Sequence, residues 1–167
     1  ITLKPSFDRF FTLLNAHLEK TLFLFGGRPS AADFAIAGQV AQLLLDPTPG
    51  DWLRAQAPFV AEWSKFMDAP NAGGPFKPLS ELEETLLPLF RDEIAVTYLP
   101  WAKANMDAAE AKEERVTLKL DGKAYEQITQ HYAARAFKSV TRAVQDSKDA
   151  DGLQAFLDAV HASDVFA

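Results

Sequence analysis

Carboxylates and imidazoles are the side chains with which this chain of 167 residues could act as an acid, a base or a metal ligand. Asp158 and His161 stand three positions apart, which would place two metal ligands on one face of a helix. A solvated surface pair is the alternative interpretation, and the sequence lacks the Glu-x-x-His pairs of a carboxylate-bridged metal site. The other closely spaced carboxylates lie among further charges, as on wet helix faces: Glu81 with Glu84, and Glu110 with Glu113. The sequence therefore predicts no metal site and no catalytic residues of its own.

An aromatic and polar cluster is the second candidate for chemistry. Tyr98, Trp101 and Asn105 follow one another at i, i+3 and i+7, so a helix would present them on one face. A kink at Pro100 could open this face towards a substrate pocket, whereas core packing with two polar tips is the alternative. Further side chains that could line a pocket or satisfy buried carbonyl groups are Arg28, Gln39 and Gln42.

The start of one helix is clearly marked in the sequence. Ser30 takes the N-cap position and Asp33 the third helical position, so the two form a Ser-x-x-Asp capping box. From there to Leu45 the only polar residues are two glutamines, and a helix that is apolar nearly all round is either buried or spans a membrane. With about sixteen residues it is shorter than the roughly 20 that a span needs. The sequence therefore predicts a buried core helix in a helical domain.

The composition excludes several classes of protein. The net charge is −6 and no stretch is dense in lysine and arginine, which argues against a nucleic-acid partner. The absence of cysteine excludes disulfides, thiolate metal sites and a cysteine nucleophile, and it agrees with a cytoplasmic location. No signal peptide or lipidation motif is visible, so no membrane partner is expected. The length and the apolar share of 48% are those of one ordinary globular domain.

The remaining periodicities predict more helices and one hairpin. A long helix follows Pro78 and contains Pro88, which should kink it. Between residues 115 and 127 apolar residues alternate on either side of Asp121-Gly122, the pattern of a β-hairpin. Apolar residues recur at helical spacing in four further stretches, namely residues 5–20, 52–67, 128–145 and 152–162. We therefore predict an all-α fold with one small β-hairpin near residues 115–127.

The stretch from Leu24 to Ile36 resembles a motif of the glutathione S-transferase C-terminal domain. In that family a glycine-bearing loop precedes a Ser/Thr-x-x-Asp capping box, which starts the central buried helix. With the neighbouring helices the resemblance covers residues 5–70, and it implies a helical bundle in which Ser30 and Asp33 support folding rather than catalysis. We expect a single domain over residues 1–167. Its family-like core would occupy residues 1–75, and residues 76–167 would form a subfamily-specific long helix, hairpin and C-terminal helices.

The resemblance also implies where the chemistry of such a protein lies. In the family an N-terminal thioredoxin-like domain binds glutathione and carries the activating Tyr, Ser or Cys. The helical domain supplies the apolar wall for a small electrophile and much of the homodimer contact. No βαβ pattern precedes the first helix here, so we expect this chain to be the C-terminal part of a longer protein. Alone it would hold no cofactor and be inactive, and glutathione would be a co-substrate of the full-length protein.

Two functions remain open on this evidence. The first is the co-substrate-side domain of a protein that conjugates glutathione or performs related thiol chemistry. The second is a non-enzymatic helical module for protein interaction or scaffolding, because a fold does not by itself determine a function. An upstream thioredoxin-like segment with an activating residue would favour the first.

Overall fold

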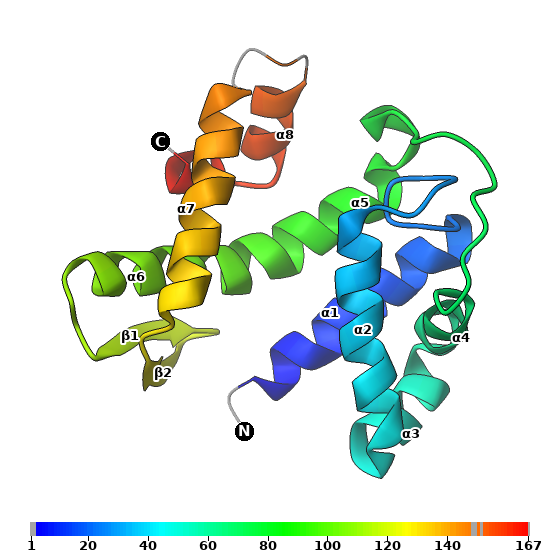
Figure 1. Ribbon diagram of the computed structural model, residues 1–167, viewed down its shortest axis with the longest axis horizontal. Coiled ribbons are helices and arrows are strands. Elements are labelled where there is room, and N and C mark those ends of the chain that lie inside the picture. Colours follow the sequence, from blue (N-terminus) through cyan, green and yellow to red (C-terminus); the bar gives the residue numbers. More distant parts are fainter. Residues whose placement is uncertain (1–2, 148–149, 151, 167) are drawn as a thin grey trace. The chain divides into compact units, whose positions relative to one another are not determined.

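The chain forms two compact units in the computed structural model, which describes residues 3–147, 150 and 152–166 (Figure 1). One unit contains residues 7–89, and the other combines the described residues of 1–6 and 90–167. Helices dominate both, and the paired strands of the described residues form one two-stranded sheet. The predicted all-α fold with one small hairpin is therefore confirmed. The prediction of one domain over the whole chain stays a prediction.

The unit of residues 7–89 surrounds a small apolar core. Its elements are α1 (Lys4–Lys20, whose first residues precede the unit), α2 (Ala31–Leu45), α3 (Pro47–Gln56), α4 (Pro58–Phe66), the 3₁₀ turn η1 (Leu79–Glu81) and α5 (Glu83–Leu89). Helix α2 packs against α3 and α4, which also pack against each other. The fully buried apolar side chains come from four helices and from the turn before α2: Leu14, Phe23, Val40, Leu53 and Val60.

Helix α2 is buried on one side only, which corrects the prediction of a core helix buried all round. Asp33, Ala37 and Val40 form its buried side. On the other side Phe34 is 52% exposed and Leu45 is 85% exposed. The sequence pattern was misleading because apolar residues occupy the outer side of the helix as well as the inner side. Within the described residues, no helix combines the length and the apolar character needed to cross a membrane.

The turn before α2 is fastened to the segment that precedes α5. The Gly27 N–H donates to the carbonyl oxygen of Pro75 at 2.9 Å. The Gly27 carbonyl oxygen accepts from the N–H groups of Gly73 and Gly74, at 2.7 and 2.9 Å. A Cβ atom at Gly27 would lie 2.8 Å from the Cα atom of Gly74, so this approach of two backbones requires glycine at position 27.

The second unit is organised around α6 and α7. Its elements are the π-helix η2 (Phe90–Tyr98), α6 (Leu99–Glu110), β1 (Arg115–Leu120), β2 (Lys123–Ile128), α7 (His131–Asp146), α8 (Leu153–Ala159) and the 3₁₀ turn η3 (Ser163–Val165). Helix α6 packs against α7 and contacts β1. The antiparallel strands pair from Arg115 with Ile128 to Leu120 with Lys123. Asp121 and Gly122 both have positive φ, as a two-residue hairpin turn requires.

The predicted long helix after Pro78 is in fact divided into helical segments of different types, among them α5 (α-helical), η2 (π-helical) and α6 (α-helical). Helix α5 contains Pro88, η2 follows from Phe90, and α6 starts one residue before Pro100. Proline lacks a backbone N–H and clashes with the carbonyl of the preceding turn, so it interrupts the α-helical hydrogen-bond ladder. The two prolines therefore bracket the stretch in which the backbone changes to the wider π-helix. A kink was predicted at Pro88, but the change of helix type was not.

Candidate functional site

The carboxylate of Asp33 is the most heavily used polar group at the start of α2. Its Oδ2 atom accepts from the Ser30 N–H at 2.8 Å and from the Ser30 hydroxyl at 2.6 Å. In the other half of the capping box the Asp33 N–H donates to Ser30 Oγ, with the longer distance of 3.4 Å. Asp33 is completely buried, and its charge lies at the positive end of the helix dipole. Ser30 and Asp33 thus hold the chain entry into α2.

A further bond extends this capping box into a network. Asp33 Oδ1 accepts from the backbone N–H of Leu24 at 2.8 Å. The carbonyl oxygen of the same Leu24 lies 2.9 Å from Nε2 of His17, a completely buried side chain of α1. The backbone of Leu24 is therefore held at its N–H by α2 and at its carbonyl by α1.

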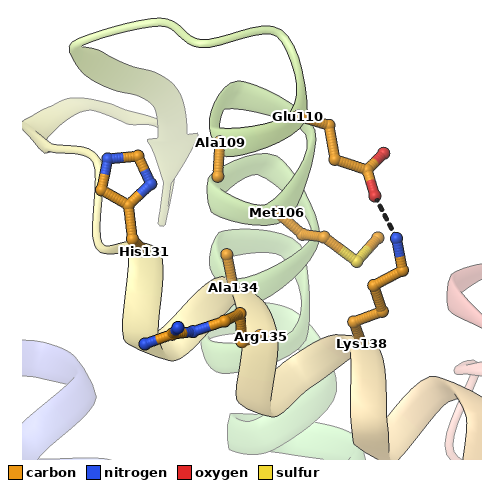
Figure 2. A pocket seen from close by; sticks show the side chains of 7 residues that line it. All are labelled: Met106, Ala109, Glu110, His131, Ala134, Arg135 and Lys138. Atoms are coloured by element: carbon orange, nitrogen blue, oxygen red, sulfur yellow. Dashed lines mark hydrogen bonds and ion pairs between the residues drawn. The ribbon is translucent and has the colours of Figure 1, made fainter.

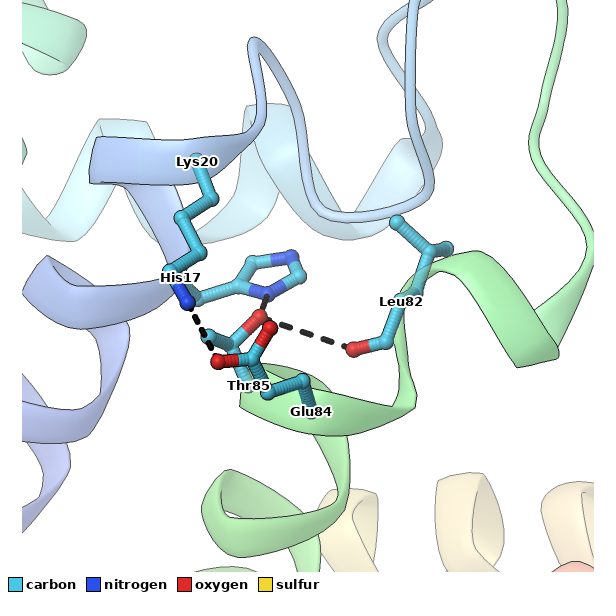
Figure 3. A network of polar contacts seen from close by, with 5 residues as sticks. All are labelled: His17, Lys20, Leu82, Glu84 and Thr85. Atoms are coloured by element: carbon cyan, nitrogen blue, oxygen red, sulfur yellow. Dashed lines mark hydrogen bonds and ion pairs between the residues drawn. The ribbon is translucent and has the colours of Figure 1, made fainter.

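The neighbours of His17 determine its tautomer (Figure 3). A carbonyl oxygen can only accept, so Nε2 of His17 carries a hydrogen and donates to Leu24. In the neutral ring Nδ1 then accepts from the hydroxyl of Thr85 in α5, at 2.7 Å. The carbonyl oxygen of Leu82 lies 3.5 Å from the same hydroxyl. If His17 gained a proton, the Thr85 hydroxyl could turn to Leu82 and accept from Nδ1 instead.

Burial favours the neutral form of this histidine. Removal of the ring from water lowers the pKa of His17 below its ordinary value of 6.5, against the opposing effects of the Leu24 carbonyl and the Asp33 charge. The nearest charged pair in Figure 3, Lys20 with Glu84 at 2.5 Å, is solvent-exposed. Such a surface pair contributes little to stability.

Two of the predicted pocket residues lie at the surface of the unit of residues 7–89. Arg28 is exposed, and its guanidinium carbon lies 5.4 Å from the ring centroid of Phe76, a cation–π distance. Gln39 is exposed on α2. Neither side chain satisfies a buried carbonyl among the described residues.

Tyr98 and Trp101 are brought together in the other unit. Their ring centroids are 5.8 Å apart, and Tyr98 is about half exposed. The Nε1 atom of Trp101 is buried without an acceptor among the described residues. The exposed part of this aromatic pair is the Tyr98 ring, whereas the indole N–H of Trp101 is inside the structure.

Asn105, the third residue of the predicted cluster, uses its side chain for hydrogen bonds to another segment. Its side chain is completely buried. Its Oδ1 atom accepts from the N–H of Gln130 at 2.8 Å, and its Nδ2 atom donates to the carbonyl oxygen of Gln130 at 3.0 Å. Asn105 thus attaches the residue before α7 to α6, which is a structural contact. Spacing along the helix could not reveal a partner 25 residues away.

The sequence also understated the role of His17. It lies beside the apolar stripe of α1, a position typical of a packing or boundary residue. Its two hydrogen bonds instead join three segments of the unit. The only advance signal was a polar ring next to a stripe of apolar residues.

The Asp33 network predicts a stability difference between two helix caps. Asp33→Ala should lower the free energy of unfolding by about 3 kcal/mol, because it leaves the buried N–H of Leu24 and the partly buried N–H of Ser30 without acceptors. Asp46→Ala is the control, since Asp46 caps α3 at an exposed position and should cost about 1 kcal/mol. Urea denaturation followed by circular dichroism measures both. Equal losses would show that burial adds nothing to the Asp33 cap.

The environment of His17 predicts a loss of stability in mild acid. Because the pKa of His17 is lower in the folded than in the unfolded chain, the unfolded chain binds the proton first as the pH falls below 6.5. The urea midpoint should therefore fall between about pH 7.5 and about pH 5.5. His17→Gln should reduce this slope, whereas His131→Gln, at an exposed position in the other unit, should retain it. An unchanged slope in His17→Gln would contradict the assignment.

The contact of Asn105 predicts a structural role that can be separated from ligand binding. Asn105→Ala should lower the free energy of unfolding by about 2 kcal/mol, because the Gln130 backbone loses both partners. Asn71→Ala in an exposed loop is the matched control and should change nothing measurable. If thermal melts of Asn105→Ala match those of the unchanged chain, the attachment of α7 does not depend on this side chain.

One family model matches the helical region that contains the capping box. Residues 3–65 match the model described as "Glutathione S-transferase, C-terminal domain". The comparisons with curated proteins and with solved structures each returned no match. The matched residues include α1, α2, α3 and most of α4, and therefore both partners of the capping box. The helical region of residues 3–65 is thus similar to the C-terminal domain of glutathione S-transferases.

Proposed function

We propose that the chain is the co-substrate-side domain of a glutathione transferase-like protein. In this proposal it supplies an apolar wall for a small electrophile and contacts for a homodimer. A thioredoxin-like domain binds glutathione, lowers the pKa of its thiol and holds it against the electrophile. The family match over residues 3–65 supports the proposal, as does the absence of cysteine, which suits a cytoplasmic protein.

The observation that carries the proposal is an exposed apolar stripe on α2. It consists of Phe34, Gly38, Ala41 and Leu45, which recur at i, i+4, i+7 and i+11 and are all exposed. A stripe of this kind on a helix is typical of a surface that another apolar group covers. The helix that the family motif starts thus presents one apolar side to its own unit and another to the outside.

The two small residues in the middle of the stripe indicate how it is covered. A Cβ atom at Gly38 would meet no other atom within 4 Å, so nothing in the described chain requires glycine there. In the middle of a helix glycine is less stable than alanine by about 1 kcal/mol. A flat stretch at Gly38 and Ala41, between the larger Phe34 and Leu45, would admit a ligand or a second backbone close to α2.

A substitution at Gly38 tests this role. Gly38→Leu should leave the urea midpoint of the 167-residue chain unchanged or raise it, because the site is open and leucine favours a helix. In the full-length protein the same change should lower kcat/KM for an apolar electrophile roughly tenfold or more, since small displacements in a binding site have large effects on rate. Ala143→Leu, at an exposed position of α7, is the matched control.

The test is read on two properties of the full-length protein: retention on immobilised glutathione and conjugation of a panel of electrophiles. The proposal is supported if the full-length protein is retained and conjugates an electrophile. In addition, Gly38→Leu must weaken conjugation while Ala143→Leu does not. A protein that is neither retained nor able to conjugate any of the electrophiles is not a transferase. The alternative, a non-enzymatic interaction or scaffold module, then follows if Gly38→Leu still disrupts a homodimer, because the same exposed stripe favours a protein partner.

A further inference from the structure

A groove lies between α6 and α7 in the second unit (Figure 2). It has a volume of about 410 Å³, within the range of roughly 300 to 1,000 Å³ of small-molecule sites. Met106 and Ala109 of α6 and Ala134 of α7 form its apolar floor. The floor includes a methionine, whose flexible side chain adapts to irregular apolar groups.

The basic side chains around this floor come from one stripe of α7. His131, Arg135, Lys138 and Arg142 recur at i, i+4, i+7 and i+11, in a chain whose net charge is −6. The first three of them line the groove, and Arg142 does not. A row of charges on a helix is most often a solvated face, so the combination of these three side chains with a concave apolar floor is what distinguishes this site.

The two sides of the groove differ in charge balance. On one side Nζ of Lys138 lies 2.9 Å from a carboxylate oxygen of Glu110, so these two charges neutralise each other. On the other side the carbonyl oxygen of Arg135 accepts from the Ser139 hydroxyl, but its guanidinium has no hydrogen-bond or ion-pair partner among the described residues. His131 stands on that same side in Figure 2, away from the Glu110–Lys138 pair. The groove thus has one side with an unpaired guanidinium, an apolar floor and one side with a neutralised ion pair.

We propose that this groove binds a small organic monoanion, a carboxylate carried on an apolar group. The planar guanidinium of Arg135 matches the two oxygens of a carboxylate, and a ring N–H of His131 can donate to the same group. The apolar group of the ligand then lies on Met106, Ala109 and Ala134. The far end holds the Glu110–Lys138 pair, which has no net positive charge to offer a second carboxylate, so the site favours a monoanion over a dicarboxylate. This proposal rests on the groove alone and is independent of the proposed function.

Octanoate is a suitable probe for the 167-residue chain, with two relatives as ligand controls. Octanol has the same apolar group without the charge, and octanedioate adds a second carboxylate at the far end. In heteronuclear NMR titrations octanoate should shift the amide signals of Met106, Ala109, Ala134 and Arg135. Octanol and octanedioate should bind more weakly than octanoate, and added salt should weaken the binding of octanoate.

Two arginine variants on the same helix test the assignment of the charge. Arg135→Gln should raise the dissociation constant of octanoate roughly tenfold or more, as expected for loss of a hydrogen bond to a charged group. Arg142→Gln removes an equal charge from the same stripe outside the groove and should change it less than about twofold. Both positions are exposed, and the unperturbed remainder of each spectrum shows that the variant is folded.

Four results would overturn the proposal: no shifts with octanoate, shifts outside the groove, equal weakening by both variants, or octanol binding as tightly as octanoate. Equal binding of octanedioate would overturn the role of the Glu110–Lys138 pair. None of these results bears on whether the full-length protein conjugates glutathione.

Discussion

The rest of the unit of residues 7–89 depends on the hydrogen bonds that the buried carboxylate of Asp33 accepts. It accepts from Ser30 at the start of α2 and from the backbone of Leu24 in the preceding turn. A buried charge is unfavourable unless several donors compensate it, and here two N–H groups, one hydroxyl and the helix dipole do so. Through Leu24 the same turn is joined to His17, and through His17 to α5. One side chain thus positions three segments that are distant in sequence.

Local patterns in the sequence were sufficient for much of the fold. The capping box and the Asp121-Gly122 turn depend on neighbouring residues, and the hairpin pairs as its alternation predicts. The family motif could also be recognised in the sequence, because it lies within one short stretch that includes Gly26, Ser30 and Asp33. These features share a cause: the partners of each hydrogen bond or turn lie within a few residues of one another.

Features with distant partners were not predictable in the same way. The pairings of His17 with Thr85 and of Asn105 with Gln130 join residues 68 and 25 positions apart. Hydrophobicity alone could not orient α2, because the residues on its exposed side resemble those on its buried side. Of the predicted pocket residues, Tyr98 and Trp101 are in ring contact, whereas the Asn105 side chain is hydrogen-bonded to the Gln130 backbone. The groove between α6 and α7 was not predicted, because its lining residues come from two helices that are separated in the sequence.

The contact between Gly27 and the glycines at positions 73 and 74 turns the intervening chain into a closed loop that contains α2, α3 and α4. The entropic cost of closing such a loop grows only with the logarithm of its length, so a few backbone hydrogen bonds suffice to hold it. Local openings of proteins follow contiguous, cooperative units of this kind. Separation of the glycines would therefore release the ends of all three helices together. The exposed stripe would then move together with α2, which itself would stay helical.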